Sequence, residues 1–299
     1  MLSQLNNRLR GQSTRVLFNR GLSTTRYVAN PTPSLVRLDP ETSAPKKSEE
    51  KQGRANEIIE TVLYGSKKVK EEENQTHSKM LARGKYVHEI QTHRVKPEKV
   101  DEYIALTSKY LPKFANDPLN DVHLCGSWSV EIGEPDTFVH IWEYKGYPGH
   151  KQTTERLAQD PAYVKFMKEL RPLLISRENG MMLEFSFWQT SPPKITNGIY
   201  ELRKYSLLPG RLLEWEMHWR KGLECRRQFC EPVGAWFTQL GTLNTVYHMW
   251  QYPDLQTRKT TREDAWNTEG WAETVYKTVR LVTNMNSFIL KPLPFSPLR

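Results

Sequence analysis

The hydrophobic and polar positions of this chain describe one series of secondary-structure elements, and that series occurs twice. Alternation of apolar and polar residues predicts strands, and apolar positions three or four residues apart predict helices. The first series comprises strand 86–95, a helix from Pro97 to about Phe114, strands 121–131 and 136–144, helical residues 150–176 interrupted at Asp160-Pro161, and strand Met181–Gln189. The second comprises strand 198–207, helix 209–228, strands 233–240 and 244–252, helices 254–266 and 270–282, and strand 284–291.

Sequence identity between the two series indicates that they are copies of one unit. Seven residues recur at a constant offset of 108, where ordinary residue usage would give roughly one by chance. They are Gly126, Trp128, Gly133, Thr137, His140, Trp142 and Tyr144, which match Gly234, Trp236, Gly241, Thr245, His248, Trp250 and Tyr252. Upstream the offset is 112, as between Glu89 and Glu201. Four additional residues are therefore expected in the loop near Asn116–Val122 of the first copy.

Each copy has the element order β-α-β-β-α-β, which is that of a ferredoxin-like unit. We therefore predict an α+β fold in which two tandem ferredoxin-like units form an architecture of the dimeric α+β barrel type. Helices would lie outside, and aromatic side chains would lie between the two sheets. The expected units are residues 83–192 and residues 193–299. An exposed strand edge at each end of the pair would allow the chain to form a homo-oligomer.

Residues 1–30 have the composition of a mitochondrial transit peptide, because arginines are interleaved with leucines and hydroxyl residues. Residues 1–38 hold six Arg and no Asp or Glu, and Arg20-Gly21-Leu22-Ser23 resembles a matrix-processing site. Residues 31–82 predict a proline-containing linker followed by a charged helical arm. We therefore expect a location in the mitochondrion, either in the matrix or peripheral to a mitochondrial membrane.

Composition narrows the classes of function. The net charge is +9, but residues 1–38 carry +6 of it, and the remaining +3 does not indicate nucleic-acid binding. No run of apolar residues approaches the length of a transmembrane helix. The three cysteines match no metal-binding spacing and are interpreted as reduced thiols. We find no phosphate-binding glycine loop, nucleophile elbow or nucleotide fingerprint, and so assign no catalytic residue, metal or cofactor.

Several segments of the two copies resemble the NipSnap family, and together they extend over about residues 83–299. They are Tyr200-Glu201-Leu202-Arg203-Lys204-Tyr205 with Pro209-Gly210, both His-x-Trp-x-Tyr strands, Leu183-Glu184-Phe185-Ser186-Phe187-Trp188, and Trp271-Ala272-Glu273-Thr274-Val275-Tyr276 followed by Pro297-Leu298. The resemblance implies a dimeric α+β barrel fold and a mitochondrial protein. Animal members are linked to vesicle trafficking and to the marking of damaged mitochondria for autophagy through adaptor proteins. Mitochondrial or autophagy-related proteins are therefore the expected partners.

One candidate ligand pocket follows from the repeated strands. Residues i, i+2 and i+4 of a strand share one face, and in both copies that face carries His, Trp and Tyr. If both faces line the space between the sheets, they would surround a planar ligand or assist proton transfer near neutral pH. The candidate residues are His140, Trp142, Tyr144, His248, Trp250 and Tyr252, together with Glu201 and Arg203 on a neighbouring strand. Alternatively each His is a hydrogen-bonded core residue, which the duplication favours because a packing motif is expected in both copies.

Glu201 and Arg203 also admit two interpretations. As residues on the same strand face they would either pair with each other or bind a polar ligand, and pairing is the favoured interpretation. The first copy has Glu89 and Gln91 at these positions, so any charged site would differ between the copies.

Two functions remain open at this stage. The first is a non-enzymatic mitochondrial protein of the NipSnap type that acts through protein–protein interaction, as a scaffold in mitochondrial quality control or vesicle traffic. The second is a small-molecule-binding or oxygenase-like barrel that uses His140 and His248. A space between the sheets filled by tryptophan would favour the first function, and an open aromatic cavity reached by a histidine would favour the second.

Overall fold

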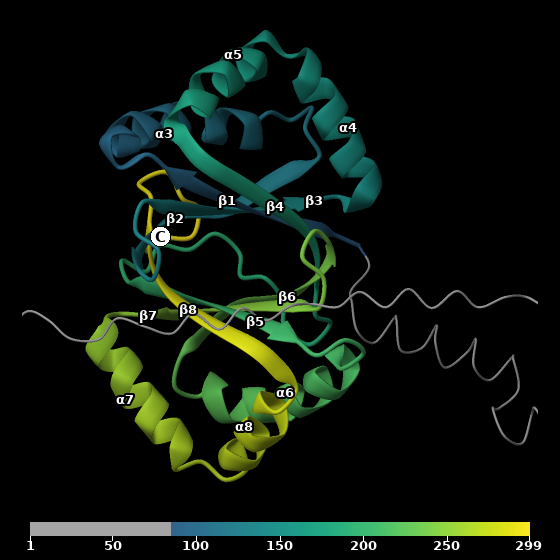
Figure 1. Ribbon diagram of the computed structural model, residues 1–299, viewed down its shortest axis with the longest axis vertical. Coiled ribbons are helices and arrows are strands. Elements are labelled where there is room, and N and C mark those ends of the chain that lie inside the picture. Colours follow the sequence, from purple (N-terminus) through teal and green to yellow (C-terminus); the bar gives the residue numbers. More distant parts are fainter. Residues whose placement is uncertain (1–84) are drawn as a thin grey trace, which may run out of the picture. The chain divides into compact units, whose positions relative to one another are not determined.

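The computed structural model describes residues 85–299 (Figure 1). These residues lie within one compact unit. The predicted transit peptide, linker and charged arm lie outside the described residues. Within residues 85–299, no helix is long and apolar enough to cross a membrane.

Eight antiparallel strands close into a barrel in the order β1-β3-β2-β8-β5-β7-β6-β4. They are β1 (Val87–Val95), β2 (Val122–Ile132), β3 (Thr137–Tyr144), β4 (Leu174–Glu184), β5 (Ile199–Leu207), β6 (Glu231–Leu240), β7 (Thr245–Tyr252) and β8 (Val282–Pro292). The first four strands and the last four occupy the same relative places, so the ring consists of two equivalent halves. We call the half with β1 to β4 copy one and the half with β5 to β8 copy two.

Helices cover the outer face of each half (Figure 1). Copy one contains η1 (Pro97–Lys99), α3 (Val100–Ala115), α4 (Gly146–Gln159), α5 (Pro161–Leu170) and η2 (Arg171–Leu173), and copy two contains α6 (Leu212–Arg227), α7 (Leu255–Trp266) and α8 (Trp271–Val279). Local chemistry explains where several begin. Asp160 caps α5 by accepting a hydrogen bond from the Ala162 amide at 2.8 Å, and Pro161 occupies the first turn.

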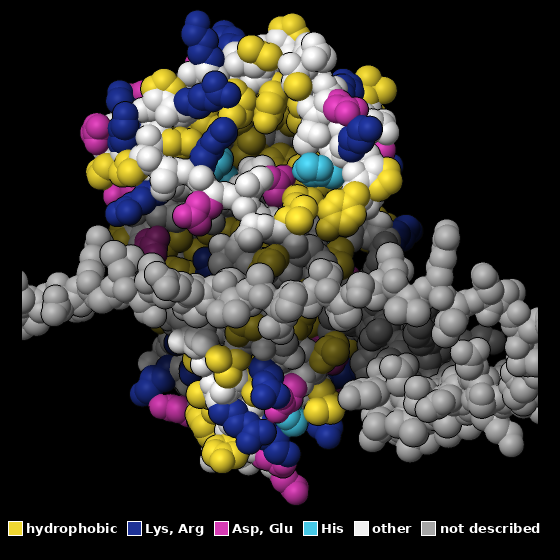
Figure 2. Space-filling model, turned by 45° about the vertical axis from the view of Figure 1, so that its right-hand side comes forward, with side chains coloured by type: hydrophobic (Ala, Val, Ile, Leu, Met, Phe, Trp, Pro, Cys, Tyr) yellow, Lys and Arg dark blue, Asp and Glu magenta, His cyan; other side chains and the backbone are white. Residues whose placement is uncertain are grey.

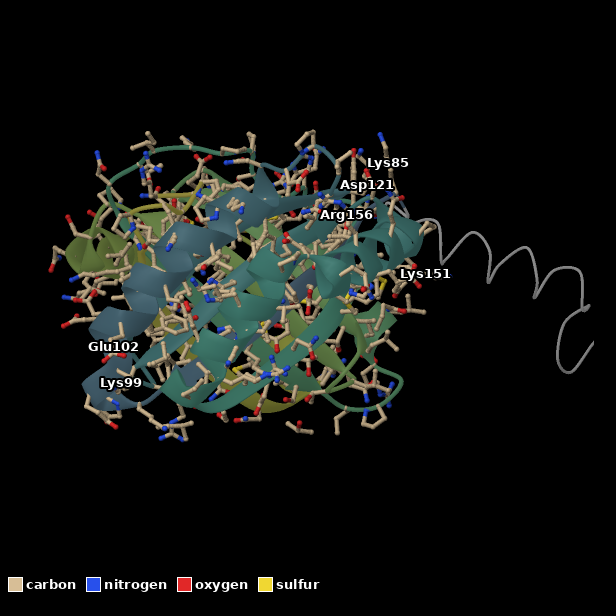
Figure 3. The ribbon with its side chains drawn as sticks, turned by 90° about the horizontal axis from the view of Figure 1, so that it is seen from above. Lys85, Lys99, Glu102, Asp121, Lys151 and Arg156 are labelled. Carbon is tan, nitrogen blue, oxygen red and sulfur yellow. The ribbon has the colours of Figure 1, made fainter. Side chains whose placement is uncertain are left out.

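The loop that follows α3 holds α4 in place over copy one. Arg156 of α4 donates to Asn120 at 2.6 Å and to Asp117 at 2.7 Å. Figure 3 shows Arg156 at one end of this helical layer, and Lys99 and Glu102 of η1 and α3 at the other. Helices α3 and α6 remain related by 112 residues, whereas β3 and β7 are related by 108. The four additional residues of copy one therefore lie in this loop, as predicted.

The structure corrects the expected end of copy one. The closing strand is β4, Leu174–Glu184, rather than 181–189, and the helical residues before it run from Gly146 to Leu173 rather than over 150–176. Residues 176–179 are exposed and polar, so they lack the apolar alternation that identifies a strand. Pairing with β1, from His88↔Met182 to Val95↔Leu174, is what makes this segment extended.

The expectation of an exposed strand edge at each end of the pair is wrong. Closure of the ring pairs β2 with β8 and β4 with β6. The edge strands of each four-stranded half therefore pair with edge strands of the other half.

The space between the two sheets is packed with apolar side chains. It contains Trp128 and Trp236, both almost fully buried, with methionines, leucines and valines from both halves. A Cβ atom at Gly126 would lie 2.3 Å from the Trp128 ring, and one at Gly234 would lie 2.3 Å from the Trp236 ring. Each indole thus lies against the glycine two residues earlier, which explains why Gly-x-Trp occurs in both copies.

Candidate functional site

The face of β3 with His140, Trp142 and Tyr144 points toward the helices, not between the sheets. His140 Nε2 lies 2.7 Å from the hydroxyl of Tyr103 in α3, while the alternate residues Val139 and Ile141 belong to the core between the sheets. These side chains therefore do not line the inter-sheet space, which was the condition for the candidate pocket, and His140 is instead a hydrogen-bonded residue between sheet and helix. Nearly every residue of β3 is buried, because helices cover one face and the other sheet covers the second. The sequence pattern alone does not distinguish the two faces.

The equivalent face of β7 also points toward helices. The His248 ring lies 4.8 Å from that of Trp219 in α6, measured between ring centroids. Trp250 Nε1 donates to His248 Nδ1 at 2.9 Å. Tyr252 accepts a hydrogen bond from Arg226 of α6 at 2.6 Å. The candidate residues of the two copies therefore lie on opposite sides of the barrel and do not form one pocket.

A chain of buried hydrogen bonds connects four polar side chains of copy one. The Tyr103 hydroxyl lies 2.8 Å from His93 Nδ1 and 2.7 Å from His140 Nε2, so it donates to one imidazole and accepts from the other. His140 Nδ1 in turn lies 2.8 Å from the Ser127 hydroxyl. Burial, and next the charge of Arg177, lower the pKa of His93 to about 4. Burial also holds the pKa of His140 well below its ordinary value, so both imidazoles are neutral at pH 7.

Copy two does not contain this chain. Trp215 stands where copy one has Tyr103, and Ala235 stands where copy one has Ser127. Within the described part of the chain, His248 consequently bonds only to Trp250, and its Nε2 atom is buried without a hydrogen-bond partner. The polar arrangement around the repeated histidine is thus a property of copy one.

Copy one has a cavity of about 490 Å³ between the outer face of its sheet and its helices. We call it the copy-one cavity. In Figure 2, hydrophobic side chains lie recessed among the helices of the upper half, beside His and acidic side chains. Of the predicted site residues, Trp142 and Tyr144 line the cavity and His140 does not. The lining also includes Glu89, Gln91, His93, Leu111, Phe114, His150, Thr153, Leu157, Tyr163, Phe166, Met167, Arg177, Glu178 and Asn179.

The polar centre of the copy-one cavity is the carboxylate of Glu89 on β1. Glu89 is only 5% exposed. It accepts one hydrogen bond from the Tyr144 hydroxyl at 2.9 Å and another from Asn179 Nδ2 at 2.7 Å. His150 of α4 packs edge-on against Tyr144, with 4.9 Å between the ring centroids. Among residues 85–299, no Lys, Arg or His forms an ion pair with Glu89.

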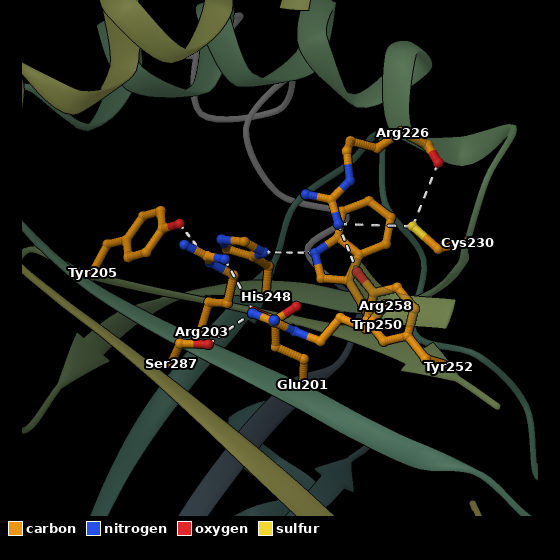
Figure 4. Close-up of polar contacts among 10 residues, drawn as sticks. All are labelled: Glu201, Arg203, Tyr205, Arg226, Cys230, His248, Trp250, Tyr252, Arg258 and Ser287. Atoms are coloured by element: carbon orange, nitrogen blue, oxygen red, sulfur yellow. Dashed lines mark hydrogen bonds and ion pairs between the residues drawn. The ribbon is translucent and has the colours of Figure 1, made fainter. Parts of the chain in front are cut away.

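The equivalent carboxylate of copy two, Glu201, is enclosed by cationic side chains (Figure 4). Arg258 lies 2.6 Å and Arg203 lies 3.0 Å from Glu201 Oε1, and Ser287 donates to the same oxygen at 2.8 Å. Burial opposes ionisation of Glu201, but these hydrogen bonds and charges outweigh it and lower its pKa to about 2. The ion pair expected between Glu201 and Arg203 is therefore present.

Residues that the sequence analysis did not select complete the copy-one site: His93, Tyr103 and His150. The signal that would have found them is the difference between the copies. At the constant offsets, His150 corresponds to Arg258 and Gln91 corresponds to Arg203, so copy one lacks both guanidinium groups. A search for positions where copy two has an arginine and copy one does not, rather than for identical residues, points to this pocket.

A second group of polar side chains lies on the other face of the copy-one sheet. His88 Nε2 lies 3.1 Å from Glu143 Oε2, and Glu184 is close enough that one ligand atom from each residue falls within 4.8 Å of the others. These three residues could hold a metal ion, although the His88–Glu143 pair also accounts for their proximity. They come from three different strands, so no spacing in the sequence reveals them. Glu143 and Glu184 also line a further cavity of about 970 Å³.

The copy-one cavity therefore combines apolar and aromatic walls with the buried carboxylate of Glu89, the neutral imidazole of His93 and several further polar side chains. Cavities of this size are typical of small-molecule binding. The carboxylate can accept hydrogen bonds or pair with a cation. Because Tyr103 engages Nδ1 of His93, only the other nitrogen of that ring is available to a ligand.

The chain is similar to proteins of one known family and, in its fold, to solved structures. A family model described as NIPSNAP matches residues 88–188 and 200–297. Protein NipSnap homolog 1 of Danio rerio is 41% identical over 226 residues, covering 75% of this chain and 81% of that protein. Protein NipSnap homolog 2 of Homo sapiens is 40% identical over 226 residues, covering 75% of this chain and 79% of that protein. A Fusobacterium nucleatum structure provisionally described as a monooxygenase aligns at TM-score 0.55 and 12% identity over 70% of this chain and 93% of that chain, which shows likeness of fold alone.

Proposed function

Because this chain belongs to the NipSnap family, we propose that it is a mitochondrial protein that binds a small organic molecule in the copy-one cavity. The observation that carries the proposal is the difference between the two copies. Both have a buried Glu at the same place, but Glu89 of copy one borders a cavity of about 490 Å³ and has no ion-pair partner among residues 85–299. Its counterpart Glu201 is enclosed by two arginines.

One larger side chain of copy two supports this reading. Trp219 of α6 stands where α3 has Thr107, and it lies against Trp215 and His248. Arg226, in the position of Phe114, places its guanidinium 4.7 Å from the Trp250 ring centroid. A unit that only needs a packed core can fill space between helix and sheet with a side chain of this size. An unfilled space costs stability and is retained where a ligand uses it.

The experiment is native mass spectrometry on the full chain purified from its own cells. We expect an additional mass of about a few hundred daltons on the wild-type protein, as a ligand of this cavity size would give. The variant His150→Arg introduces the residue that copy two has at this position, so it should pair with Glu89 and displace the ligand. Lys151→Arg is the matched control, because it changes the next residue of α4 at a fully solvated position.

The outcomes separate clearly. Loss of the additional mass in His150→Arg but not in Lys151→Arg supports the proposal. A wild-type protein that carries no small molecule, or one that keeps it in His150→Arg, contradicts binding in the copy-one cavity.

A protein–protein interaction role is the second candidate. It is favoured by the packing of Trp128 and Trp236 between the sheets, where both indoles are almost fully buried. In this proposal the chain is a mitochondrial scaffold, with a cleaved transit peptide and with mitochondrial or autophagy-related partners, and its halves are tandem ferredoxin-like units. Partners that co-purify equally with wild type and His150→Arg would support this role, and their absence from both would oppose it.

A further inference from the structure

The two copies have a buried carboxylate at the same position, but the charges of the groups around it differ. Glu201 receives both of its cationic partners from within the chain, at 2.6 Å from Arg258 and 3.0 Å from Arg203. Among residues 85–299, Glu89 receives only neutral donors, the Tyr144 hydroxyl and the Asn179 amide. A buried carboxylate that lacks a cation is costly, because desolvation is not offset by an opposite charge.

The positions that differ show what is missing from copy one. Arg258 reaches Glu201 from α7, and the residue at its position in α4 is His150, whose ring lines the copy-one cavity. Asn179 occupies the position of Ser287, so the hydrogen bond from the neighbouring strand is kept in both copies. The guanidinium is therefore the part that has no equivalent in copy one, and the cavity lies where that guanidinium would be.

From this comparison we propose that the ligand of the copy-one cavity is an organic cation, an amine, amidine or guanidine on an apolar body, whose charged group pairs with Glu89. The inference rests on the proposed function, and it adds the chemical class of the ligand. In effect, the ligand supplies from solution the group that Arg258 supplies in copy two. The geometry to expect is a short contact with the carboxylate, as between Arg258 and Glu201 at 2.6 Å.

The other groups around the cavity are consistent with a cation. Arg177 and Glu178 of β4 also line the cavity, and within residues 85–299 Arg177 forms no ion pair with Glu89. Both are exposed, whereas Glu89 is buried. His93 adds no positive charge at pH 7, because burial and the charge of Arg177 lower its pKa to about 4. The aromatic faces of Trp142 and Tyr163 offer further favourable contacts to a cation.

The test uses three probes of nearly the same shape and different charge: benzamidine, benzamide and benzoate. Binding to the full chain is measured at pH 7.5 by ligand-observed NMR and isothermal titration calorimetry. We expect benzamidine to bind at least ~10-fold more tightly than benzamide, as a charge-assisted hydrogen bond predicts, and benzoate not to bind. Glu89→Gln should remove the difference between benzamidine and benzamide, and His150→Arg should remove binding of both. Glu155→Gln, which removes an exposed negative charge from the same helix, should change neither affinity.

Each outcome decides one proposal. Equal affinities for benzamidine and benzamide, both lost in His150→Arg, would overturn the cationic class and leave binding in the cavity standing. Benzamidine binding that survives Glu89→Gln unchanged would also overturn the pairing with Glu89. If none of the three probes binds, the cationic class is overturned, and the mass carried by the purified protein decides separately whether the cavity holds a ligand.

Discussion

The protonation of His93 predicts how the stability of this protein depends on pH. Burial and the charge of Arg177 lower the pKa of His93 from 6.5 to about 4 in the folded protein. The unfolded chain therefore takes up a proton at higher pH than the folded chain. The contribution of His93 is fully present above pH 6.5 and is lost as the pH falls toward 4.

The magnitude follows from the difference between these two pKa values. One pKa unit corresponds to about 1.4 kcal/mol, so full protonation costs roughly 3 kcal/mol, and the change from pH 7 to pH 5 costs about 2 kcal/mol. For a folded region of this size, that loss lowers Tm by roughly 4–8 °C. His140 and His248 are also buried with lowered pKa values, so the whole protein should lose more than His93 alone accounts for.

The assay is urea unfolding at pH 7 and pH 5, compared between wild type and His93→Gln. Gln does not titrate, and its side-chain oxygen can accept the hydrogen bond of Tyr103. We expect the variant to lose about 2 kcal/mol less than wild type between the two pH values. His123→Gln controls for the removal of an exposed imidazole. The reasoning is refuted if wild type and His93→Gln lose the same free energy of unfolding, within roughly 0.5 kcal/mol.

Three further predictions concern packing and buried polar groups, and urea unfolding at pH 7 measures each. Gly126→Ala should cost about 1–3 kcal/mol, because the new Cβ would lie 2.3 Å from the Trp128 ring, and an unchanged stability would show that the indole is free to move. Glu201→Gln should cost about 3–5 kcal/mol, because it leaves two guanidinium groups without their carboxylate, and a smaller cost than that of the same change at an exposed glutamate would contradict the buried ion pair. His140→Phe should cost about 2–4 kcal/mol and more than His248→Phe, because it removes two hydrogen bonds rather than one, and the reverse order would be inconsistent with the network.

The sequence was sufficient to predict the features that depend on local residue patterns or on comparison of the two copies with each other. Period-two alternation and Pro97 located β1 and the helix after it, and the change of offset from 112 to 108 located the longer loop of copy one. The segments that resemble NipSnap proteins identified the family, which the matches over residues 88–188 and 200–297 confirm. Each of these features depends on residues that are contiguous in the sequence, so it can be found without knowing how the chain packs.

The candidate site needed the tertiary structure, because it depends on which face of a buried strand meets which partner. His140 and Ile141 are equally buried, yet one meets a helix and the other meets the opposite sheet. Residues 176–179 are polar in the sequence, and they become part of a strand because β1 pairs with them. The sequence does show that copy one lacks the two arginines that copy two has beside Glu201, but it does not show that Glu89 borders a cavity. The chain determined by itself that there are two copies and where they differ in charge, and only the packing of distant helices against the sheet decided that Glu89 has a cavity beside it.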